Sequence, residues 1–424
     1  MSFNTISVVG LGYIGLPTAA MFASRKKKVI GVDVNQHAVD TINRGGIHIV
    51  EPELDMIVHA AVTDGYLKAT TTPEPADAFL IAVPTPFKNN DSEIPEPDLS
   101  YIKKASEAIA PVLKKGDLVI LESTSPVGAT EQMAVWLAAA RPDLTFPGPE
   151  SSYKDTSMDV NIAHCPERVL PGHVVRELVE NDRVIGGITA KCSARSVELY
   201  KTFVQGECVI TNARTAEMAK LTENSCRDVQ IAFANELSII CDKLDIDVWE
   251  LISLANRHPR INILQPGPGV GGHCIAVDPW FIVSKTPEQA QMIHTARKVN
   301  DAKPQWVINK VKLAIADFLQ ANPTKTTKDV TVACYGLAFK PDIDDLRESP
   351  ALGILKAVAS FHSGNLIAVE PNIRSLPVGL GNIELFELSK ALKVADVHVL
   401  LVDHEEFKYQ KISTGHIVDT KGIW

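Results

Sequence analysis

The chain has 424 residues, of which 45% are apolar and 22% are charged, which is typical of a folded protein with two or three domains. Its formal net charge of −9 argues against the basic face that nucleic-acid binding needs, so we expect no nucleic-acid partner. No apolar run approaches the roughly 18 residues of a membrane span, and the N-terminal residues do not resemble a secretory signal, so we expect a cytoplasmic protein without a membrane span.

Strand and helix signals alternate along the first part of the chain. Helices are predicted over residues 15–25 and from an Asp98 N-cap to about 113, and the polar segment 147–160 is predicted to be a surface loop. Such alternation predicts βαβ units and a parallel sheet. The predicted strands of this part are Ile6–Val9, Val29–Val34, Phe79–Val83 and Leu118–Leu121.

The middle of the chain differs, because residues 212–255 contain neither proline nor glycine and carry apolar residues at helical spacing. We predict one long helix and a shorter one here, then a glycine-rich loop over 266–273 and a further helix over about 287–320. The alternation then returns, with a helix predicted over 349–361. The strands predicted in this last part are Val330–Tyr335, Leu366–Val369 and Val397–Val402.

The first glycine-rich motif follows the first predicted strand and opens the first predicted helix. In such a turn the first glycine permits the tight bend, the second lets a pyrophosphate approach, and the third lets helix and strand pack closely. Asp33 ends the second predicted strand, where a carboxylate suits the ribose hydroxyls of NAD and repels the 2′-phosphate of NADP. We therefore predict NAD binding, with a structural turn in a cofactor-free fold as the alternative. The residues involved are Gly10, Gly12, Tyr13, Ile14, Gly15 and Asp33.

A polar stripe lies along the long predicted helix of the middle part. Lys220, Asn224 and Arg227 are spaced so that they share one helical face. Considered alone, such a polar stripe is more often a solvated helix face, and its position before the second glycine-rich motif is what favours a functional role. Phe233 lies on another face, where we expect it to fill the core.

The seven cysteines are widely spaced and include no C-x-x-C pair, which predicts neither a disulfide framework nor a metal site. Cysteines are most often small buried residues. Cys274 differs because it directly follows the glycine-rich loop, where little side-chain bulk would block a ligand and a thiolate could act as a nucleophile. Asp278 follows four residues later, and the adjacent His273 is expected to be structural.

Several motifs occur in an order that resembles the UDP-sugar 6-dehydrogenase family over essentially the whole chain. This resemblance implies an α/β fold with two Rossmann-like, doubly wound parallel-sheet domains joined by a central helical domain. It implies an NAD-binding domain over 1–205, a central domain with the catalytic loop and a dimer contact over 206–305, and a UDP-sugar-binding domain over 306–424. The motifs are Gly10–Gly15, Lys220-x-x-x-Asn224, Gly271-Gly272-His273-Cys274 with Asp278, Phe339-Lys340-Pro341, and the segment from Asp344 to Pro350.

Two segments, Cys165–Gly172 and Asn256–Arg260, resemble the branch of this family that acts on UDP-N-acetylhexosamines, since the UDP-glucose branch has Asn-Pro-Glu-Phe where this chain has Cys-Pro-Glu-Arg. The expected reaction is an NAD-dependent four-electron oxidation of the sugar C6 alcohol of UDP-N-acetyl-D-mannosamine, in the synthesis of a cell-envelope polysaccharide. UDP-N-acetylglucosamine is the alternative substrate. A two-electron β-hydroxyacid-type dehydrogenase and a non-enzymatic nucleotide-sugar sensor are rival hypotheses, and neither of these proteins would need a thiol.

The same resemblance implies a role for individual residues. Cys274 would form a thiohemiacetal and then a thioester, Lys220 and Asn224 would stabilise the oxyanion, and three further residues would handle water or protons, namely Asp278, Glu167 and Thr124. Thr85, Thr130 and Arg347 are expected at the cofactor. The residues expected to contact the substrate are Arg168, Val169, Lys220, Asn224, Arg227, His258, Arg260, Gly271, Phe339, Lys340 and Lys421.

The C-terminal part repeats two features of the N-terminal dinucleotide turn. Gly336 ends a predicted strand as Gly10 does, and Glu370 ends the next strand as Asp33 does. The run after Gly336 lacks the other two glycines of the fingerprint, so these residues alone do not predict a dinucleotide there.

The long helix also carries an apolar stripe that predicts an interface. The stripe is more than one neighbour within the chain would readily cover, and the resemblance implies that this segment forms a symmetric homodimer. The stripe consists of Ile231, Ala234, Leu237 and Ile240.

Overall fold

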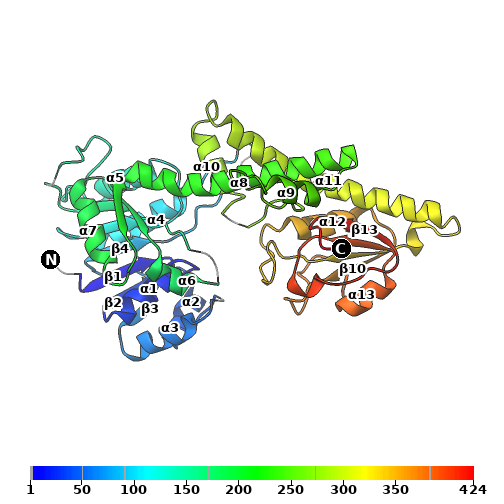
Figure 1. Cartoon of the computed structure of the whole chain (residues 1–424). Helices are drawn as coiled ribbons and strands as arrows, with labels where there is room; N and C mark the ends of the chain where they lie inside the picture. Colours follow the sequence, from blue (N-terminus) through cyan, green and yellow to red (C-terminus); the bar gives the residue numbers. More distant parts are fainter. Residues whose placement is uncertain are drawn as a thin grey trace. The chain divides into compact units, whose positions relative to one another are not determined.

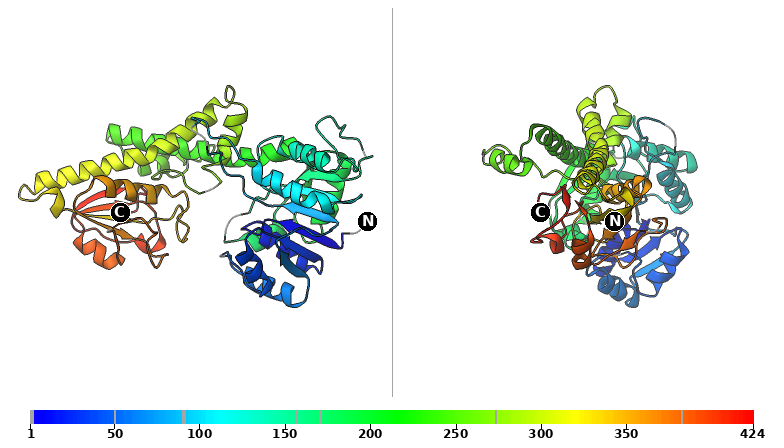
Figure 2. Two further views of the ribbon diagram at one scale, coloured as in Figure 1. Left: turned by 180° about the vertical axis from the view of Figure 1, so that it is seen from behind. Right: turned by 90° about the vertical axis from the view of Figure 1, so that its right-hand side faces the viewer.

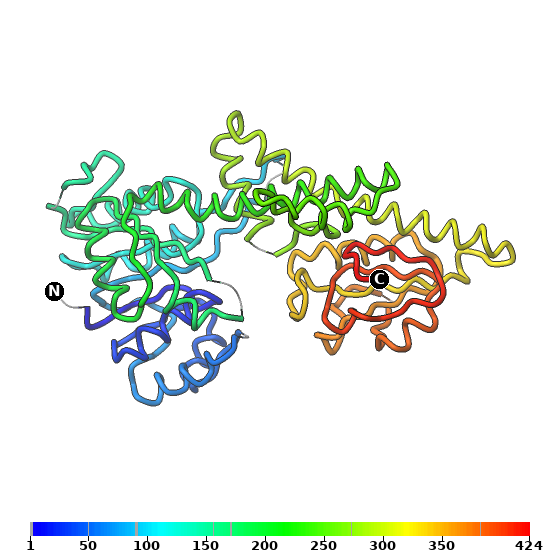
Figure 3. The backbone as a smooth tube through the Cα atoms, viewed as in Figure 1, coloured from blue at the N-terminus to red at the C-terminus, as the bar shows by residue number. Residues whose placement is uncertain are grey.

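The computed structural model describes residues 3–49, 51–89, 92–155, 157–169, 172–272, 274–381 and 383–424. His273, and Leu170 and Pro171 of the Cys165–Gly172 segment, lie outside the described residues. The chain forms two compact units, which Figure 3 traces along the backbone. We call them the N-terminal unit, Met1–Glu223 with Trp280–Lys285, and the C-terminal unit, Asn224–Pro279 with Thr286–Trp424.

The N-terminal unit is built on an eight-stranded sheet in the order β3-β2-β1-β4-β5-β6-β7-β8 (Figure 1). The pairs are parallel apart from β6 and β7, which are antiparallel. The first six strands therefore have the doubly wound order that the sequence predicts. The strands are β1 Thr5–Val9, β2 Lys28–Val32, β3 Leu67–Thr70, β4 Ala78–Ile81, β5 Leu118–Leu121, β6 Asn161–His164, β7 Arg183–Gly187 and β8 Cys208–Asn212.

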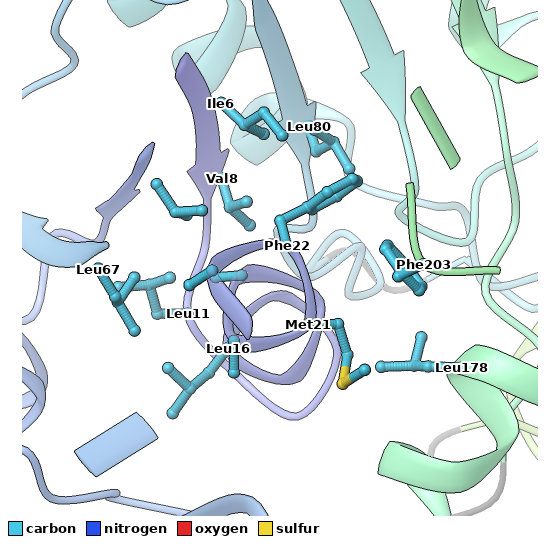
Figure 4. Close-up of a cluster of buried hydrophobic side chains, with 14 of the residues drawn as sticks. Ile6, Val8, Leu11, Leu16, Met21, Phe22, Leu67, Leu80, Leu178 and Phe203 are labelled. Atoms are coloured by element: carbon cyan, nitrogen blue, oxygen red, sulfur yellow. The ribbon is translucent and has the colours of Figure 1, made fainter. Parts of the chain in front are cut away.

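The helices of this unit cover both faces of its sheet. Alternate strand residues point to opposite faces, so Ile6 and Val8 of β1 pack with Phe22 on one side (Figure 4), whereas Val9 joins Met133 in the core on the other side. The helices are α1 Gly15–Ser24, α2 Gln36–Asn43, α3 Leu54–Thr63, α4 Ser100–Ile109, η1 Ala110–Val112, α5 Ala129–Ala140, α6 Val174–Glu180 and α7 Ala190–Tyr200. Helices α8 (Ala213–Leu244) and α10 (Asp278–Lys285) each contain residues of both units.

The C-terminal unit contains a second, all-parallel sheet in the order β11-β10-β9-β12-β13. Its long helix α11 runs along this sheet and packs on α12, as Figure 2 shows. The strands are β9 Thr331–Tyr335, β10 Asn365–Val369, β11 Glu384–Leu385, β12 Val397–Leu400 and β13 His416–Asp419. The helices are α9 Val248–Ala255, α11 Gln291–Ala321, η2 Thr327–Asp329, α12 Pro350–Phe361, α13 Leu388–Val394 and η3 Glu405–Phe407.

The structure confirms the predicted fold class, an α/β chain with two parallel-sheet regions and a central helical segment. The segment 147–160, predicted as a surface loop, precedes β6. The sequence analysis did not predict the strands β6, β7 and β8. The second strand ends at Val32 rather than Val34, whose side chain is 95% exposed. Among the described residues, no helix combines the length and apolar character that a bilayer crossing requires.

The apolar stripe predicted on α8 is displaced from the one observed. Ala234 is buried within the chain, and Phe233, expected in the core, is 51% exposed. Ile240 and Leu244 are also exposed. Phe233, Leu237, Ile240 and Leu244 follow the spacing of one helical face. The exposed apolar face therefore shares Leu237 and Ile240 with the predicted stripe, but it has Phe233 and Leu244 in place of Ile231 and Ala234.

Two glycines of the C-terminal unit provide a matched test of this fold. Gly336 ends β9 with a φ of +84°, and a Cβ there would lie 2.4 Å from the Cβ of Val402. Gly353 lies within α12, where a Cβ would meet nothing within 4 Å. We expect Gly336→Ala to destabilise the unit by roughly 2–4 kcal/mol, and Gly353→Ala to stabilise it by about 0.5–1 kcal/mol. Calorimetry on the full-length protein measures both, and equal melting temperatures for the two variants would contradict this packing.

Candidate functional site

The first glycine-rich turn has the geometry of a dinucleotide-binding turn. Gly10 has a φ of +91°, and a Cβ there would lie 2.5 Å from the carbonyl oxygen of Ala82. A Cβ at Gly15 would lie 1.8 Å from the carbonyl oxygen of Gly10, whereas one at Gly12 would meet nothing within 4 Å. The first and third glycines therefore allow close packing, and the second leaves the turn open to a ligand.

Asp33 lies beside this turn, directly after β2. Its Oδ2 accepts a hydrogen bond from the amide of Leu11 at 2.8 Å, and its Oδ1 accepts one from the amide of Asn35 at 2.9 Å. Each carboxylate oxygen has a second lone pair that can accept from a ribose hydroxyl. Thr85 follows β4, and its buried Oγ1 has no hydrogen-bond partner among the described residues. The open turn, the half-buried carboxylate and this hydroxyl fit a bound dinucleotide.

Thr130, expected at the cofactor, forms hydrogen bonds with the buried carboxylate of Glu217. Its hydroxyl donates to Oε1 of Glu217 at 2.6 Å, and the amides of Thr130 and Gly128 donate to the same carboxylate at 2.8 and 2.6 Å. Burial raises the pKa of Glu217, which these three donors oppose. The hydroxyl of Thr130 thus helps to fix the start of α5, and its predicted role at the cofactor stays a prediction. Glu217 itself was not predicted, although it lies three residues before Lys220 on the buried side of α8.

The segment after β6 places three predicted residues in the N-terminal unit. The Oε1 of Glu167 accepts from the amide of Arg168 at 2.7 Å, and Val169 packs on the hydrophobic core. The guanidinium of Arg168 pairs with Glu223 on α8 at 2.9 Å. Lys220 is half-buried one turn earlier on α8, and Thr124 is half-buried after β5. The predicted catalytic and substrate-binding residues of this unit are Thr124, Glu167, Arg168, Val169 and Lys220.

The C-terminal unit brings Asn224 and Asp278 together. The Nδ2 of Asn224 donates to Oδ2 of Asp278 at 2.5 Å. Asp278 is buried at the start of α10, and its amide donates to the carbonyl oxygen of Cys274 at 2.8 Å. Cys274 is exposed one turn before this helix. The exposed thiol therefore lies on a turn that is closed by Asp278, the residue that also binds Asn224. Arg227 lies one turn further along α8 and is exposed.

The glycine-rich loop is fastened at its start by a buried polar chain. The amide of Gly267 donates to Oδ1 of Asn235, and Asn235 donates to Asn300, both at 2.9 Å. Asn300 in turn donates to Asp228 at 2.8 Å, and Arg297 pairs with Asp228 at 2.6 Å. These residues connect α8 and α11, and none of them was singled out from the sequence. The sequence indicates these residues only by placing polar side chains at positions where helical spacing predicts burial.

Close packing requires the glycines at the end of this loop. A Cβ at Gly271 would lie 2.6 Å from the carbonyl oxygen of Glu348 and 2.7 Å from Cδ of Pro350. A Cβ at Gly272 would lie 3.0 Å from the ring of Phe339. The small residues therefore let the loop approach the segment after β9, whereas the sequence pattern suggested that they leave room for a ligand. Phe339 and Gly271, predicted separately, lie against each other.

The remaining predicted residues of the C-terminal unit lie on its surface or in short turns. Lys421 pairs with Asp403 at 3.0 Å, and its Nζ would lie 3.8 Å from a Cβ at Gly267, which places it beside the glycine-rich loop. Arg347 pairs with Asp345 at 2.6 Å, and Lys340 is exposed. His258 and Arg260 are exposed after α9, where the amide of Arg260 donates to Nδ1 of His258 at 3.3 Å.

Glu370 occupies the position of Asp33 in the second sheet, but its surroundings differ. Its Oε2 accepts from the amide of Leu337 at 2.7 Å, and Nε2 of His404 lies 2.9 Å from the same oxygen. Burial disfavours its charge, but the hydrogen bonds from His404 and Leu337 lower the pKa of this carboxyl below its usual value. Glu370 is 3% exposed, so its carboxylate serves the turn itself rather than facing a ligand.

Comparison with known proteins places the chain among nucleotide-sugar dehydrogenases. It is 66% identical to a UDP-N-acetyl-D-mannosamine dehydrogenase of Yersinia pestis, over all of both chains. It is 61% identical to an NDP-N-acetyl-D-galactosaminuronic acid dehydrogenase of Ralstonia nicotianae, over all of this chain and 97% of that one. A solved structure of a UDP-D-ManNAc dehydrogenase from Pyrococcus horikoshii is 37% identical, with a TM-score of 0.85 over 99% of this chain and 96% of that one.

Three domain models of one family match in chain order. The NAD-binding domain matches residues 4–204, the central domain residues 214–302, and the UDP-binding domain residues 333–424. The predicted NAD cofactor and the predicted resemblance are thereby confirmed. The chain belongs to the UDP-glucose/GDP-mannose dehydrogenase family.

Proposed function

We propose that this chain oxidises the C6 alcohol of UDP-N-acetyl-D-mannosamine to the carboxylate, with two molecules of NAD as electron acceptors, for the synthesis of a cell-envelope polysaccharide. The observation that carries the proposal is the exposed Cys274 thiol, one turn before the hydrogen-bonded pair of Asp278 and Asn224. A binding protein needs no such thiol, whereas oxidation from alcohol to acid needs a group that holds the carbon at the aldehyde level.

The reaction proceeds in four steps. The alcohol first loses a hydride and a proton and becomes an aldehyde. The thiolate of Cys274 adds to the aldehyde carbon, and protonation of the oxygen gives a thiohemiacetal. Loss of a second hydride and a proton gives a thioester, and water then cleaves the thioester to the carboxylate and the free thiol. Bound NAD supplies the hydride acceptor for both oxidations.

The residues have distinct tasks in these steps. Lys220 and Asn224 stabilise the oxyanion that forms when the thiolate or water adds, and losing one such donor typically costs about 10²–10³ in rate. The hydrogen bond to Asp278 orients the amide of Asn224 for this task. Glu167, Thr124 and Asp278 orient water or accept its proton.

The choice of sugar rests on the relatives and on three residues. The Yersinia and Ralstonia relatives are named for N-acetylated sugars that differ in ring stereochemistry, and mannosamine is favoured because the former is more similar to this chain. Arg168, His258 and Arg260 are assigned to the acetamido group or the diphosphate. None of the seven cysteines forms a disulfide within the described part of the chain, which suits a reducing cytoplasm.

The cofactor preference follows from the carboxylate of Asp33. Its oxygens already accept amides of the glycine-rich turn and of the start of α2, which fixes the negative charge near the expected ribose position. A 2′-phosphate there would be repelled, so NAD is preferred over NADP.

The exposed stripe on α8, formed by Phe233, Leu237, Ile240 and Leu244, is assigned to a homodimer. A long helix is mostly stabilised by tertiary packing, and three of these side chains are between 45% and 61% exposed in the single chain. A two-fold axis places this stripe against its own copy and covers both.

Counting NADH with a panel of UDP-sugars tests the proposed reaction. We expect two NADH for each UDP-N-acetyl-D-mannosamine, and slower oxidation of the N-acetylglucosamine and N-acetylgalactosamine analogues. Cys274→Ser should lower uronate production by roughly 10³-fold or more, because serine is a weaker nucleophile and leaving group. Cys226→Ser, which changes another exposed thiol, is the control and should be active. One NADH per sugar would indicate a two-electron enzyme, and oxidation of UDP-glucose alone would refute the branch.

Substituting Asp33 tests the cofactor preference. Asp33→Ser should weaken NAD binding about tenfold, since it removes a charged acceptor for the ribose hydroxyls, and should reduce the discrimination against NADP. Asp40→Ser on the exposed side of α2 is the matched control, with unchanged binding of both cofactors. Isothermal titration calorimetry with NAD and with NADP measures both affinities. A wild-type preference for NADP would overturn the assignment of Asp33.

Light scattering in dilute solution tests the dimer. The wild type should have about twice the mass of one chain. Leu244→Glu should shift the protein toward monomers, because burying a charge in an apolar interface is unfavourable. Leu313→Glu introduces the same charge at a residue of α11 that is 57% exposed, and should remain dimeric. A monomeric wild type, or a dimer unaffected by Leu244→Glu, would contradict the assigned interface.

A further inference from the structure

A buried charged cluster lies in the N-terminal unit around the segment that carries Glu167. Glu122 directly follows β5, Cys165 and Glu167 follow β6, Arg183 begins β7, and Tyr200 ends α7. Arg183 is 4% exposed, and the two glutamates are 1% and 8% exposed. One guanidinium and two carboxyl groups thus share a space that water hardly reaches.

Arg183 holds Glu167 directly. Its Nη2 lies 2.7 Å from Oε2 of Glu167, and the amide of Arg168 occupies the other carboxylate oxygen. The guanidinium carbon also lies 4.7 Å from the ring centroid of Tyr200 and 5.8 Å from that of Phe203, a residue of the core shown in Figure 4. Aromatic packing therefore restrains the guanidinium. Oε1 of Glu167 accepts a hydrogen bond, whereas Oε2 makes only the ion pair with Arg183 and has no hydrogen-bond partner among the described residues.

Glu122 approaches the same guanidinium. Its Oε1 lies 3.9 Å from Nη1 of Arg183 and accepts a hydrogen bond from the hydroxyl of Tyr200 at 2.5 Å. Its Oε2 has no hydrogen-bond partner in the part of the chain that the structure describes. Burial raises the pKa of Glu122 to about 7 despite the nearby guanidinium. Burial also raises the pKa of Cys165 to about 12 and that of Tyr200 well above its usual value, so both stay protonated when Glu122 titrates.

We propose that Arg183 is a positioning residue, which holds the carboxyl group of Glu167 in place through their buried ion pair. Once Glu122 ionises, two carboxylates share one guanidinium, and Glu122 competes with Glu167 for it. Glu167 then loses part of its fixation, and the step that it serves becomes slower. The inference rests on the proposed function, because it assigns Glu167 to the activation of water or thiol.

The sign of the pH effect follows from the two states of Glu122. Its pKa in the folded protein lies above the ordinary value of 4.5, so protonation favours the folded state below 4.5, and this contribution is lost as the pH rises toward about 7. Glu122→Gln keeps an acceptor for the hydroxyl of Tyr200 but cannot ionise. The variant should therefore remove the part of the pH dependence that comes from this cluster.

The test compares the wild type with Glu167→Gln, Arg183→Lys and Glu122→Gln, using UDP-N-acetyl-D-mannosamine and NAD. Arg176→Lys, at an exposed arginine that pairs with Glu180, is the matched control. The measurements are kcat and both KM values between about pH 6 and 9, the NADH burst per site, and the melting temperature between about pH 4.5 and 8.

We expect Glu167→Gln and Arg183→Lys to share one defect, in which kcat falls on the order of tenfold to a hundredfold and both KM values change little. The control should match the wild type. In Glu122→Gln, the decline of kcat around pH 7 and the decline of the melting temperature between about pH 4.5 and 7 should both be absent. If Arg183→Lys changes the melting temperature alone, or if Glu122→Gln reproduces the wild-type pH profile, the inference is wrong.

Two further outcomes separate this inference from the proposed function. If Glu167→Gln has wild-type kcat, the role proposed for Glu167 is wrong, and the role of Arg183 with it. If Glu167→Gln is impaired but Arg183→Lys is not, only the role of Arg183 is wrong. Should Arg183→Lys fail to fold, the pH profile of Glu122→Gln decides alone, because that variant keeps the ion pair and the hydrogen bond from Tyr200.

Discussion

Backbone amides in loops have no partner within a strand or helix, and those that are buried need a hydrogen-bond acceptor from elsewhere, which in this chain is often a side chain. This constraint recurs at the loops that carry the candidate functional residues. Glu217 accepts two amides at the start of α5, Glu51 accepts those of Gly172 and Val174, and Asn235 accepts that of Gly267. Asp33 does the same for the first glycine-rich turn. The loops therefore have defined conformations before any ligand is considered.

These acceptors also connect segments that are far apart in the chain. Glu51 lies before α3, yet it fixes the beginning of α6, beyond the segment that carries Glu167. Hydrogen bonds to charged groups contribute about 1.5–3 kcal/mol each, and leaving a buried amide unpaired costs a comparable amount. A substitution at Glu51 or Glu217 would therefore disturb a loop whose own residues are unchanged. Such residues influence the site without facing a ligand.

The sequence predicts the parts of the site that are local. The three glycines and Asp33 lie within one βαβ unit, so spacing alone relates them, and the structure places them as expected. Glu217 and Thr130 are 87 positions apart, and the helical pattern around Glu217 does not indicate its partner. Arg183 was not predicted for a different reason, because an arginine at the start of a strand is usually exposed. On α8, the pattern predicted the helix correctly but misjudged its covered face, since this depends on neighbouring helices.

The two parallel sheets show how one topological position serves two purposes. Asp33 and Glu370 each follow the second strand of a βαβ unit, and each accepts the first amide after the glycine. Asp33 is half-buried and keeps acceptor capacity for a ribose, whereas His404 covers Glu370 and takes up one of its oxygens. His404 itself is fully buried, so it shields this carboxylate from solvent. The same loop geometry that opens the first turn to a dinucleotide is thereby closed in the second sheet, which leaves its glycine and carboxylate as structural elements.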